Sequence, residues 1–193
     1  MIVALGIPCY KQTIHIGTAQ TWVQDTIWAM QQGWRPLMLW ADTNSIECSR
    51  NLLVKQAEGA GARLLLMTDS DTFPAPPSGG LESMWKAMCD HGAAVVSAAV
   101  AVRGGSTMNC EPSLPGQIYE GIAGTAYQLI DLVKIRALPK PWFSVVLSDD
   151  GTEKSVGSDV GFLRAVRAAG HKTIVHYAIP MAHVESVATA TRF

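Results

Sequence analysis

The chain has little charge and no excess of either sign. Only 16% of its 193 residues are Asp, Glu, Lys or Arg, and 15 basic residues nearly balance 16 acidic ones, so the formal net charge is -1. Without a net positive field, the chain as a whole does not attract nucleic acid or an anionic membrane surface. Apolar residues make up 48% of the sequence. This excludes a disordered chain and predicts a folded, globular protein.

Long apolar runs, cysteine pairs and glycine-rich nucleotide loops are also missing. No segment has the roughly 18 to 20 apolar residues that span a bilayer, and the first residues lack the basic stretch of a signal peptide, so we expect a cytoplasmic protein. The four cysteines are too far apart for a zinc or redox motif, and we expect reduced, mostly buried thiols. No G-x-G-x-x-G motif follows the first apolar run, which argues against a dinucleotide-binding fold.

The first half of the chain alternates apolar runs with segments of helical periodicity. We expect strands at 2–7, 36–41, 63–68 and 94–102, and helices at 18–33, 45–58 and 81–92. In the first helix Thr18 suits the N-cap, and Trp22, Val23, Ile27 and Met30 keep the helical spacing. This alternation predicts an α/β fold with a mostly parallel sheet and a ligand site at the carboxyl ends of its strands.

The second half is less regular. We expect a loop or short hairpin at 103–116 and a strand turning into a short helix at 126–138. Ser158 is expected to cap a helix that ends at Gly170, and a last strand is expected at 173–177. The polar segment 148–157 is either a lid over a bound ligand or an inert surface loop.

Two carboxylates follow the third expected strand directly. Asp69 and Asp71 are one residue apart, and at the end of a buried strand each needs a charge partner or solvent. A divalent cation supplies such a partner, and carboxylate oxygens suit Mg²⁺ or Mn²⁺. The alternative is a solvated turn at the strand end.

Several segments occur in an order that resembles one known family. These segments are IPCY after the first strand, SIECSRNLLVKQA before LLLMTDSD, then GIAGTAYQLID, PWF, SDVGFLRAVRAAGHKTIV and a final His183. Together they resemble the GT-A fold glycosyltransferases, in particular the large family that includes inverting nucleotide-sugar enzymes. The resemblance implies a Rossmann-like three-layer αβα sandwich with a mostly parallel central sheet. It also implies one domain over 1–193, with a donor half at 1–102 and an acceptor half at 103–193.

The resemblance implies a metal site and a catalytic base. Asp69, Asp71 and His183 would hold Mn²⁺ or Mg²⁺ at the diphosphate of the donor, although His183 alone is equally explained as a hydrogen-bonded loop histidine. Asp159 falls where the family has its general base, although Ser158 replaces the acid that usually precedes it. An acidic residue at a helix start is also favoured by the helix dipole alone.

Further positions match the binding sites of the family. The donor-binding positions are Pro8, Tyr10, Asp42, Arg50, Asp69 and Ser70, and the acceptor- or sugar-binding positions are Gly124, Trp142 and Phe143. Arg50 either contacts a phosphate or pairs with Glu47 one turn earlier on the same helix. Gly124 either lets backbone approach a sugar or serves a turn.

These positions together define a functional hypothesis. We expect a metal-dependent hexosyltransferase that moves a sugar from a nucleoside-diphosphate sugar, in particular a UDP-sugar, to a hydroxyl group. The acceptor is either a glycan or small molecule, or a hydroxymethylated base in DNA. The DNA alternative stays open because basic residues, which can contact phosphates, concentrate in the second half. The alternatives are a haloacid-dehalogenase-type phosphatase, whose second acidic pair Asp149-Asp150 would imitate, and a non-catalytic nucleotide-sugar-binding module.

Overall fold

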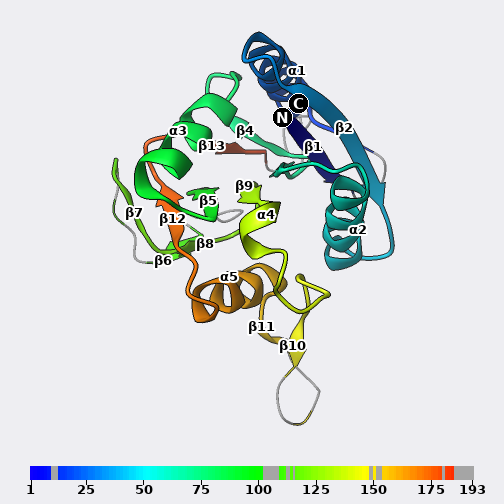
Figure 1. Cartoon of the computed structure of the whole chain (residues 1–193), viewed down its shortest axis with the longest axis vertical. Coiled ribbons are helices and arrows are strands. Elements are labelled where there is room, and N and C mark those ends of the chain that lie inside the picture. The colour runs from blue at the N-terminus through cyan, green and yellow to red at the C-terminus, as the bar shows by residue number, and fades with distance from the viewer. Residues whose placement is uncertain are drawn as a thin grey trace, which may run out of the picture.

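A seven-stranded sheet forms the centre of the computed structural model, which describes residues 1–9, 13–101, 109–111, 114, 116–147, 150, 154–179 and 181–184. The strands of this sheet are β1 (Ile2–Cys9), β2 (Arg35–Asp42), β3 (Leu64–Thr68), β5 (Val95–Ala98), β7 (Ile118–Glu120), β9 (Tyr127–Asp131) and β12 (Thr173–His176). Their order is β2-β1-β3-β9-β5-β12-β7 (Figure 1). All run in one direction except β7 and β9, so the prediction of a mostly parallel sheet is confirmed.

Helices cover both faces of this sheet. They are α1 (Ile16–Gln31), α2 (Ile46–Gly59), α3 (Leu81–His91), α4 (Leu132–Ile135) and α5 (Ser158–Ala168). One core cluster joins α1 and α3 to one face through Ala29 and Met84, and a second joins α2, α4 and α5 to the other face through Leu53, Ile135 and Phe162. The structure is therefore the three-layer sandwich that the sequence predicts.

Shorter strands surround the central sheet. They form three two-stranded pairs: β4 (Thr72–Pro74) with β13 (Met181–His183), β6 (Cys110–Glu111) with β8 (Ile122–Ala123), and β10 (Val146–Leu147) with β11 (Lys154–Val156). In the last pair, β10 precedes the expected lid at 148–157 and β11 lies within it; residues 148, 149 and 151–153 of the lid, including Asp149, lie outside the described residues. Of the expected loop or short hairpin at 103–116, the described part includes β6, whose partner β8 lies beyond that segment.

Strand β9 occupies a position that the sequence pattern does not predict. It comes from the second half of the chain but lies between β3 and β5, antiparallel to both, so that Leu129 pairs with Leu66 on one side and Val96 on the other. All five of its residues are buried. The two expected halves therefore share one sheet.

Two expected helix caps and one expectation about the thiols are wrong. The N-cap of α1 is His15, whose Nδ1 accepts a hydrogen bond from Gly17 N, whereas Thr18 is buried inside the first turn. Helix α5 has Gly157 at its N-cap, and Ser158 donates to Glu47 instead of capping.

Of the four cysteines, which are free thiols, Cys9 and Cys110 are buried while Cys48 and Cys89 are exposed. Within the described residues, no helix has the length and apolar character needed to cross a membrane.

A buried aspartate links α1 to α3. Asp25 Oδ1 accepts hydrogen bonds from the backbone N–H groups of Gly80 and Leu81 at 2.8 and 2.9 Å, and Tyr127 Oη donates to Oδ2 at 2.8 Å. Gly80 offers no side-chain cap of its own, so Asp25 caps α3 from a neighbouring helix. Burial raises the pKa of Asp25 from 3.8 to about 6, although the three hydrogen bonds oppose the shift.

This pKa shift predicts how the free energy of unfolding depends on pH. The folded state holds the Asp25 proton more tightly than the unfolded state, so stability falls as pH rises from 3.8 to about 6. Asp25→Asn keeps an oxygen acceptor for α3 and does not titrate. We expect the wild type to lose up to about 3 kcal/mol relative to this variant over that window, measured by urea unfolding at a series of pH values. Parallel pH dependences for the two proteins would contradict the assignment.

Candidate active site at the carboxyl ends of the strands

The turn Asp69-Ser70-Asp71 connects β3 to β4 and is held from several sides. The backbone N–H of His15 donates to Ser70 O at 2.8 Å, and Asp69 N donates to a carbonyl just before β9 at 2.8 Å. Strand β4 pairs with β13, and Val184 N then donates to Asp71 O at 3.0 Å. Backbone contacts from three distant segments therefore hold this turn in place. In this respect it differs from a loose, solvated strand end.

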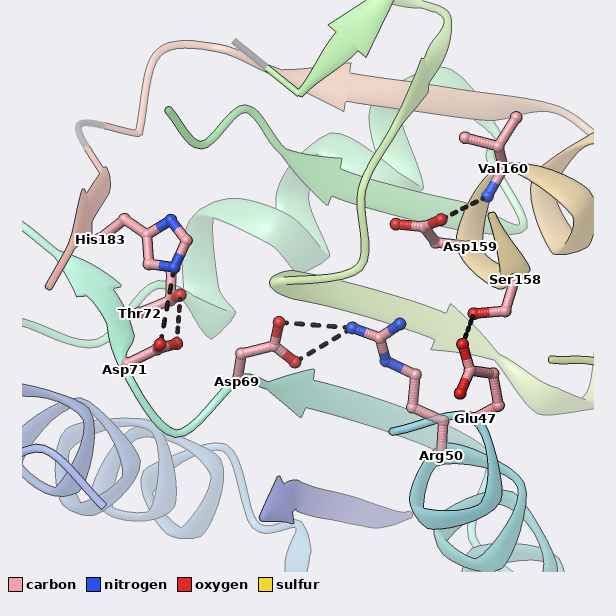
Figure 2. Close-up of polar contacts among 9 residues, drawn as sticks. All are labelled: Glu47, Arg50, Asp69, Asp71, Thr72, Ser158, Asp159, Val160 and His183. Atoms are coloured by element: carbon pink, nitrogen blue, oxygen red, sulfur yellow. Dashed lines mark hydrogen bonds and ion pairs between the residues drawn. The ribbon is translucent and has the colours of Figure 1, made fainter. Parts of the chain in front are cut away.

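Asp69 forms an ion pair with Arg50 of α2. Arg50 Nη2 lies 3.2 Å from Oδ1 and 3.3 Å from Oδ2, as Figure 2 shows. Burial raises the pKa of the Asp69 carboxyl, and the guanidinium opposes this shift. Arg50 does not pair with Glu47, so that alternative is wrong. The buried Arg50 Nε has no hydrogen-bond partner among the described residues.

Asp71 faces His183 from the other side of the turn. His183 Nδ1 lies 3.0 Å from Ala101 O, and because a carbonyl only accepts, Nδ1 must be the protonated nitrogen in this bond. The ring therefore presents Nε2 toward Asp71, with 3.6 Å between Nε2 and Oδ2. Thr72 Oγ1 donates to the other Asp71 oxygen at 3.4 Å. The histidine is thus oriented by its backbone contact, as metal-ligating histidines usually are.

These two side chains fit a divalent cation in type and spacing. Two ligands of an octahedral cation at about 2.1 Å lie about 3 Å apart, so a small movement of Asp71 or His183 would be enough. Within the described part of the chain, no three His, Cys, Asp or Glu side chains form a ready metal cage. A cation here would complete its coordination with phosphate oxygens and water, as Mg²⁺ commonly does. Asp69, which the sequence predicts as the third ligand, is already neutralised by Arg50.

Asp159 begins α5 and faces Gly124. Its Oδ1 accepts from Val160 N at 2.9 Å, so one carboxylate oxygen is fixed at the helix N-terminus (Figure 2). The other oxygen, Oδ2, would lie 3.3 Å from a Cβ added to Gly124, and Asn109 Nδ2 would lie 2.6 Å from it. A side chain at 124 would therefore collide with Asn109. The predicted Gly124 is required by this close approach.

Asn109 is a site residue that the sequence does not reveal. Its Oδ1 accepts from Val100 N at 2.8 Å, and its backbone carbonyl accepts from Gly124 N at 2.8 Å. These bonds leave the Nδ2 donor beside Gly124 and Asp159. No motif or periodicity marks this asparagine, because its position matters only once β5 and the 124 turn are brought together.

One turn of α2 supports the whole site. Glu47 accepts from Ser158 Oγ at 3.3 Å and so holds the start of α5, next to Asp159. Asn51 donates to Phe143 O at 2.7 Å and accepts from Phe143 N at 3.1 Å. With Arg50 between them, these residues tie three separate segments to a single helix, and Figure 2 shows the contacts of Glu47 and Arg50.

The two aromatic residues predicted to wall an acceptor subsite are core residues here. Phe143 is buried, and its ring lies 4.7 Å from that of Phe162. Trp142 is also buried and stacks on Phe162, although it lines a cavity of about 200 Å³ together with Pro141. Phe143 therefore acts through packing, and its ring also lies under the Arg50 guanidinium at 5.9 Å.

The remaining donor-site positions lie at the ends of the first two strands. Pro8 pairs with Ala41, and the next residue pairs with Asp42, so Pro8 and Asp42 are neighbours at the edge where the Asp69-Ser70-Asp71 turn also lies. Asp42 is exposed and Pro8 is buried. Tyr10 lies outside the described residues.

Comparisons with known proteins bear on the fold. No protein-family model matches the chain, and no curated protein matches its sequence. Among solved structures, A197 from STIV aligns with a TM-score of 0.65 at 14% identity, over 96% of this chain and 87% of that one. TarS 1–349 from S. aureus in complex with UDP aligns at 0.55 and 12% identity, over 96% of this chain and 61% of TarS 1–349. The complex of TarS 1–349 with UDP-GlcNAc aligns at 0.53, again at 12% identity, over 100% of this chain and 62% of that one.

These likenesses show the class of fold. The chain has a GT-A-like glycosyltransferase fold, so the fold prediction made from its motifs is confirmed. It spans about three fifths of TarS 1–349, at 61%. At 12 to 14% identity the comparisons establish the fold, and the chemistry has to be argued from the side chains.

The Arg50–Asp69 pair predicts a non-additive effect on stability. Arg50→Met keeps most of the packing but leaves Asp69 without its counter-charge, so we expect a loss of about 2 kcal/mol in the free energy of unfolding. Adding Asp69→Asn removes the unpaired charge and should recover at least about 1 kcal/mol. Urea unfolding of the single and double variants measures both effects. Additive losses would mean that the two side chains do not interact.

Proposed function

We propose that this protein is a glycosyltransferase that moves a sugar from a nucleoside-diphosphate sugar to a hydroxyl acceptor with the help of Mn²⁺ or Mg²⁺. The observation that carries the proposal is one constellation at the carboxyl ends of the strands. Asp71 faces an oriented His183 on one side, and Asp159 lies close to Gly124 and Asn109 on the other. A cation site and a carboxylate base at opposite ends of one site suit a substrate with a charged leaving group and an uncharged nucleophile.

The fold supports a uridine nucleotide as the donor. TarS 1–349, which shares the fold, has been solved in complex with UDP and with UDP-GlcNAc. In this chain Pro8 and Asp42 lie side by side at the strand ends and would receive the nucleoside, with Asp42 accepting a hydrogen bond from it. Ser70, in the turn between the two carboxylates, would lie at the diphosphate end of this site.

Asp71 and His183 would hold the cation, and Arg50 would keep Asp69 in place beside it. The cation, when bound, neutralises the charge that develops on the leaving diphosphate. The ion pair with Arg50 lets two carboxylates stand in one tight turn without mutual repulsion.

Asp159 would act as the general base. The acceptor hydroxyl would bind beside Asp159, and its proton would pass to Oδ2 while its oxygen bonds to the anomeric carbon. The bond from that carbon to the diphosphate breaks, and the nucleoside diphosphate leaves with the electron pair. Val160 N–H holds Oδ1 throughout, so the carboxylate does not rotate away. Asn109 Nδ2 is placed to donate to the acceptor oxygen or to Oδ2.

The contacts of three basic residues in the second half favour a glycan or a small molecule over DNA as the acceptor. Lys134 donates to the carbonyls at the end of α3, Lys140 pairs with Glu58, and Arg167 pairs with Glu120. Cations that already have partners on separate elements are poorly placed to follow a phosphate backbone. Hydroxymethylated DNA belongs in the acceptor panel as the competing outcome.

The ion pair also argues against the phosphatase alternative. A haloacid-dehalogenase-type enzyme needs an aspartate nucleophile that is open to attack on phosphorus. Both oxygens of Asp69 contact Arg50, and the turn follows the third strand of the chain. A binding module without turnover would keep the donor site but would not need the arrangement of Asp159 over Gly124.

Metal dependence is tested by nucleotide-sugar hydrolysis with Mn²⁺, with Mg²⁺ and with a chelator. We expect hydrolysis in the presence of Mn²⁺ or Mg²⁺ and none in the presence of the chelator. Asp71→Asn and His183→Gln should each lower the rate of hydrolysis roughly a hundredfold. Asp90→Asn, which alters an exposed carboxylate on α3, is the matched control and should retain activity. If no nucleotide sugar binds or turns over with either metal, the proposed function fails.

The role of the Asn109–Asp159 pair is tested by the pH dependence of kcat/KM. Asn109→Asp keeps the oxygen that accepts from Val100 N but places a second carboxylate beside Asp159. Because like charges oppose each other's ionisation, the acid limb of the profile should move to higher pH by about one unit. Gln32→Glu adds the same charge at the exposed residue that follows α1 and should leave the limb in place. An unmoved limb in Asn109→Asp would exclude this role.

A further inference from the structure

Helix α1 exposes a row of large apolar side chains, although its Trp22 and Trp28 are partly buried against the core. The residues that it buries against the sheet are small or polar: Gly17, Thr18, Thr21, Asp25 and Ala29. Four large apolar side chains are exposed instead: Ile16 (67%), Val23 (52%), Ile27 (43%) and Met30 (62%). An ordinary surface helix has the reverse arrangement, with its apolar stripe toward the core.

The exposed side chains form a continuous stripe. The steps from Ile16 to Val23, Ile27 and Met30 are seven, four and three residues, which is the spacing of a helix-pairing seam. Beside the stripe lies β2, the end strand of the sheet, where Met38 is 47% and Trp40 is 39% exposed. Thr26 Oγ1 contacts Met38 Sδ at 4.0 Å and connects the two. Figure 1 shows α1 and β2 together at one edge of the molecule.

We refer to these residues as the α1–β2 surface: Ile16, Val23, Ile27, Met30, Met38 and Trp40. They are six of the ten exposed large apolar side chains among the described residues. Such a concentration on one face marks an interaction site, whereas scattered exposed apolar residues do not.

The charge of this surface limits what can bind it. From residue 13 to residue 34, Asp25 is the sole Asp, Glu, Lys or Arg in the sequence, and it is fully buried. Nucleic acid and anionic membranes bind through Lys and Arg, and membrane-surface helices carry such residues on their polar side. The row of apolar side chains on α1 is therefore uncharged, while Asp42 of β2 is exposed and Glu82 of α3 lines a pocket with Ile27.

We propose that the α1–β2 surface binds a second copy of this chain across a two-fold axis. Two copies would bring their α1 stripes together in antiparallel orientation, with no like charges opposed. A surface about 24 Å long and about 20 Å wide covers roughly 500 Å², about three fifths of the ~800 Å² per partner of a standard interface. Val23 lies midway between Ile16 and Met30 and is therefore nearest to the axis.

The proposal is tested by charge reversal at Val23, using sedimentation velocity across a concentration series. The wild type is expected to dimerise, and Val23→Lys and Val23→Glu alone are expected to weaken dimerisation at least tenfold. A mixture of the two variants should recover a dimer, because opposite charges then face each other across the axis. Val133→Lys is the matched control, since Val133 on α4 is 51% exposed, and it should dimerise as the wild type does.

Each outcome bears on the proposal. A wild type that stays monomeric at all concentrations overturns it, as does a dimer that both Val23 variants retain. If both variants are monomeric but their mixture does not dimerise, the two Val23 side chains do not face each other, and the proposed two-fold arrangement is overturned. Thermal unfolding of the variants at low concentration should match that of the wild type, because Val23 is already exposed in the single chain. None of these results depends on the proposed enzymatic activity.

Discussion

The site depends on how a carboxylate at the end of a buried strand is compensated. Asp69 follows five buried residues of β3, and without a cation beside it the carboxylate would protonate or disrupt the turn. Arg50 supplies that cation from the second turn of α2. The helix must therefore lie over the end of β3. In that position Glu47 and Asn51 reach the start of α5 and residue 143, so one ion pair fixes the position of several loops.

The two carboxylates of one short turn thereby acquire different roles. Asp69 is held by Arg50, while Asp71 faces His183, whose ring is oriented by the carbonyl of Ala101. The sequence motif alone does not distinguish the two residues. Their environments differ, because one side of the turn faces α2 and the other faces β13. Asp71 and His183 are for this reason the better candidates for a metal that the donor brings to the site.

Sequence periodicity predicted the strands, the longer helices and the class of fold, because burial imposes a repeat on the chain. It did not predict that β9 lies between β3 and β5, since five buried residues have the same pattern beside any neighbour. Motif order led to Asp69, Asp71, Asp159 and His183, which the structure brings to one edge of the sheet, although their chemical roles stay predictions. Asn109 and the partner of Arg50 were missed because long-range contacts leave no local signal.

Helix α1 shows a further limit of periodicity. A helical repeat tells which residues share a side of a helix but not which side faces the core. Here the choice follows from Asp25, which must reach the N-terminus of α3 and the hydroxyl of Tyr127. Pointing Asp25 inward places Val23, Ile27 and Met30 on the outside. Three hydrogen bonds to a buried carboxylate thus determine the orientation of the helix, and the exposed stripe that results is what a second copy would cover.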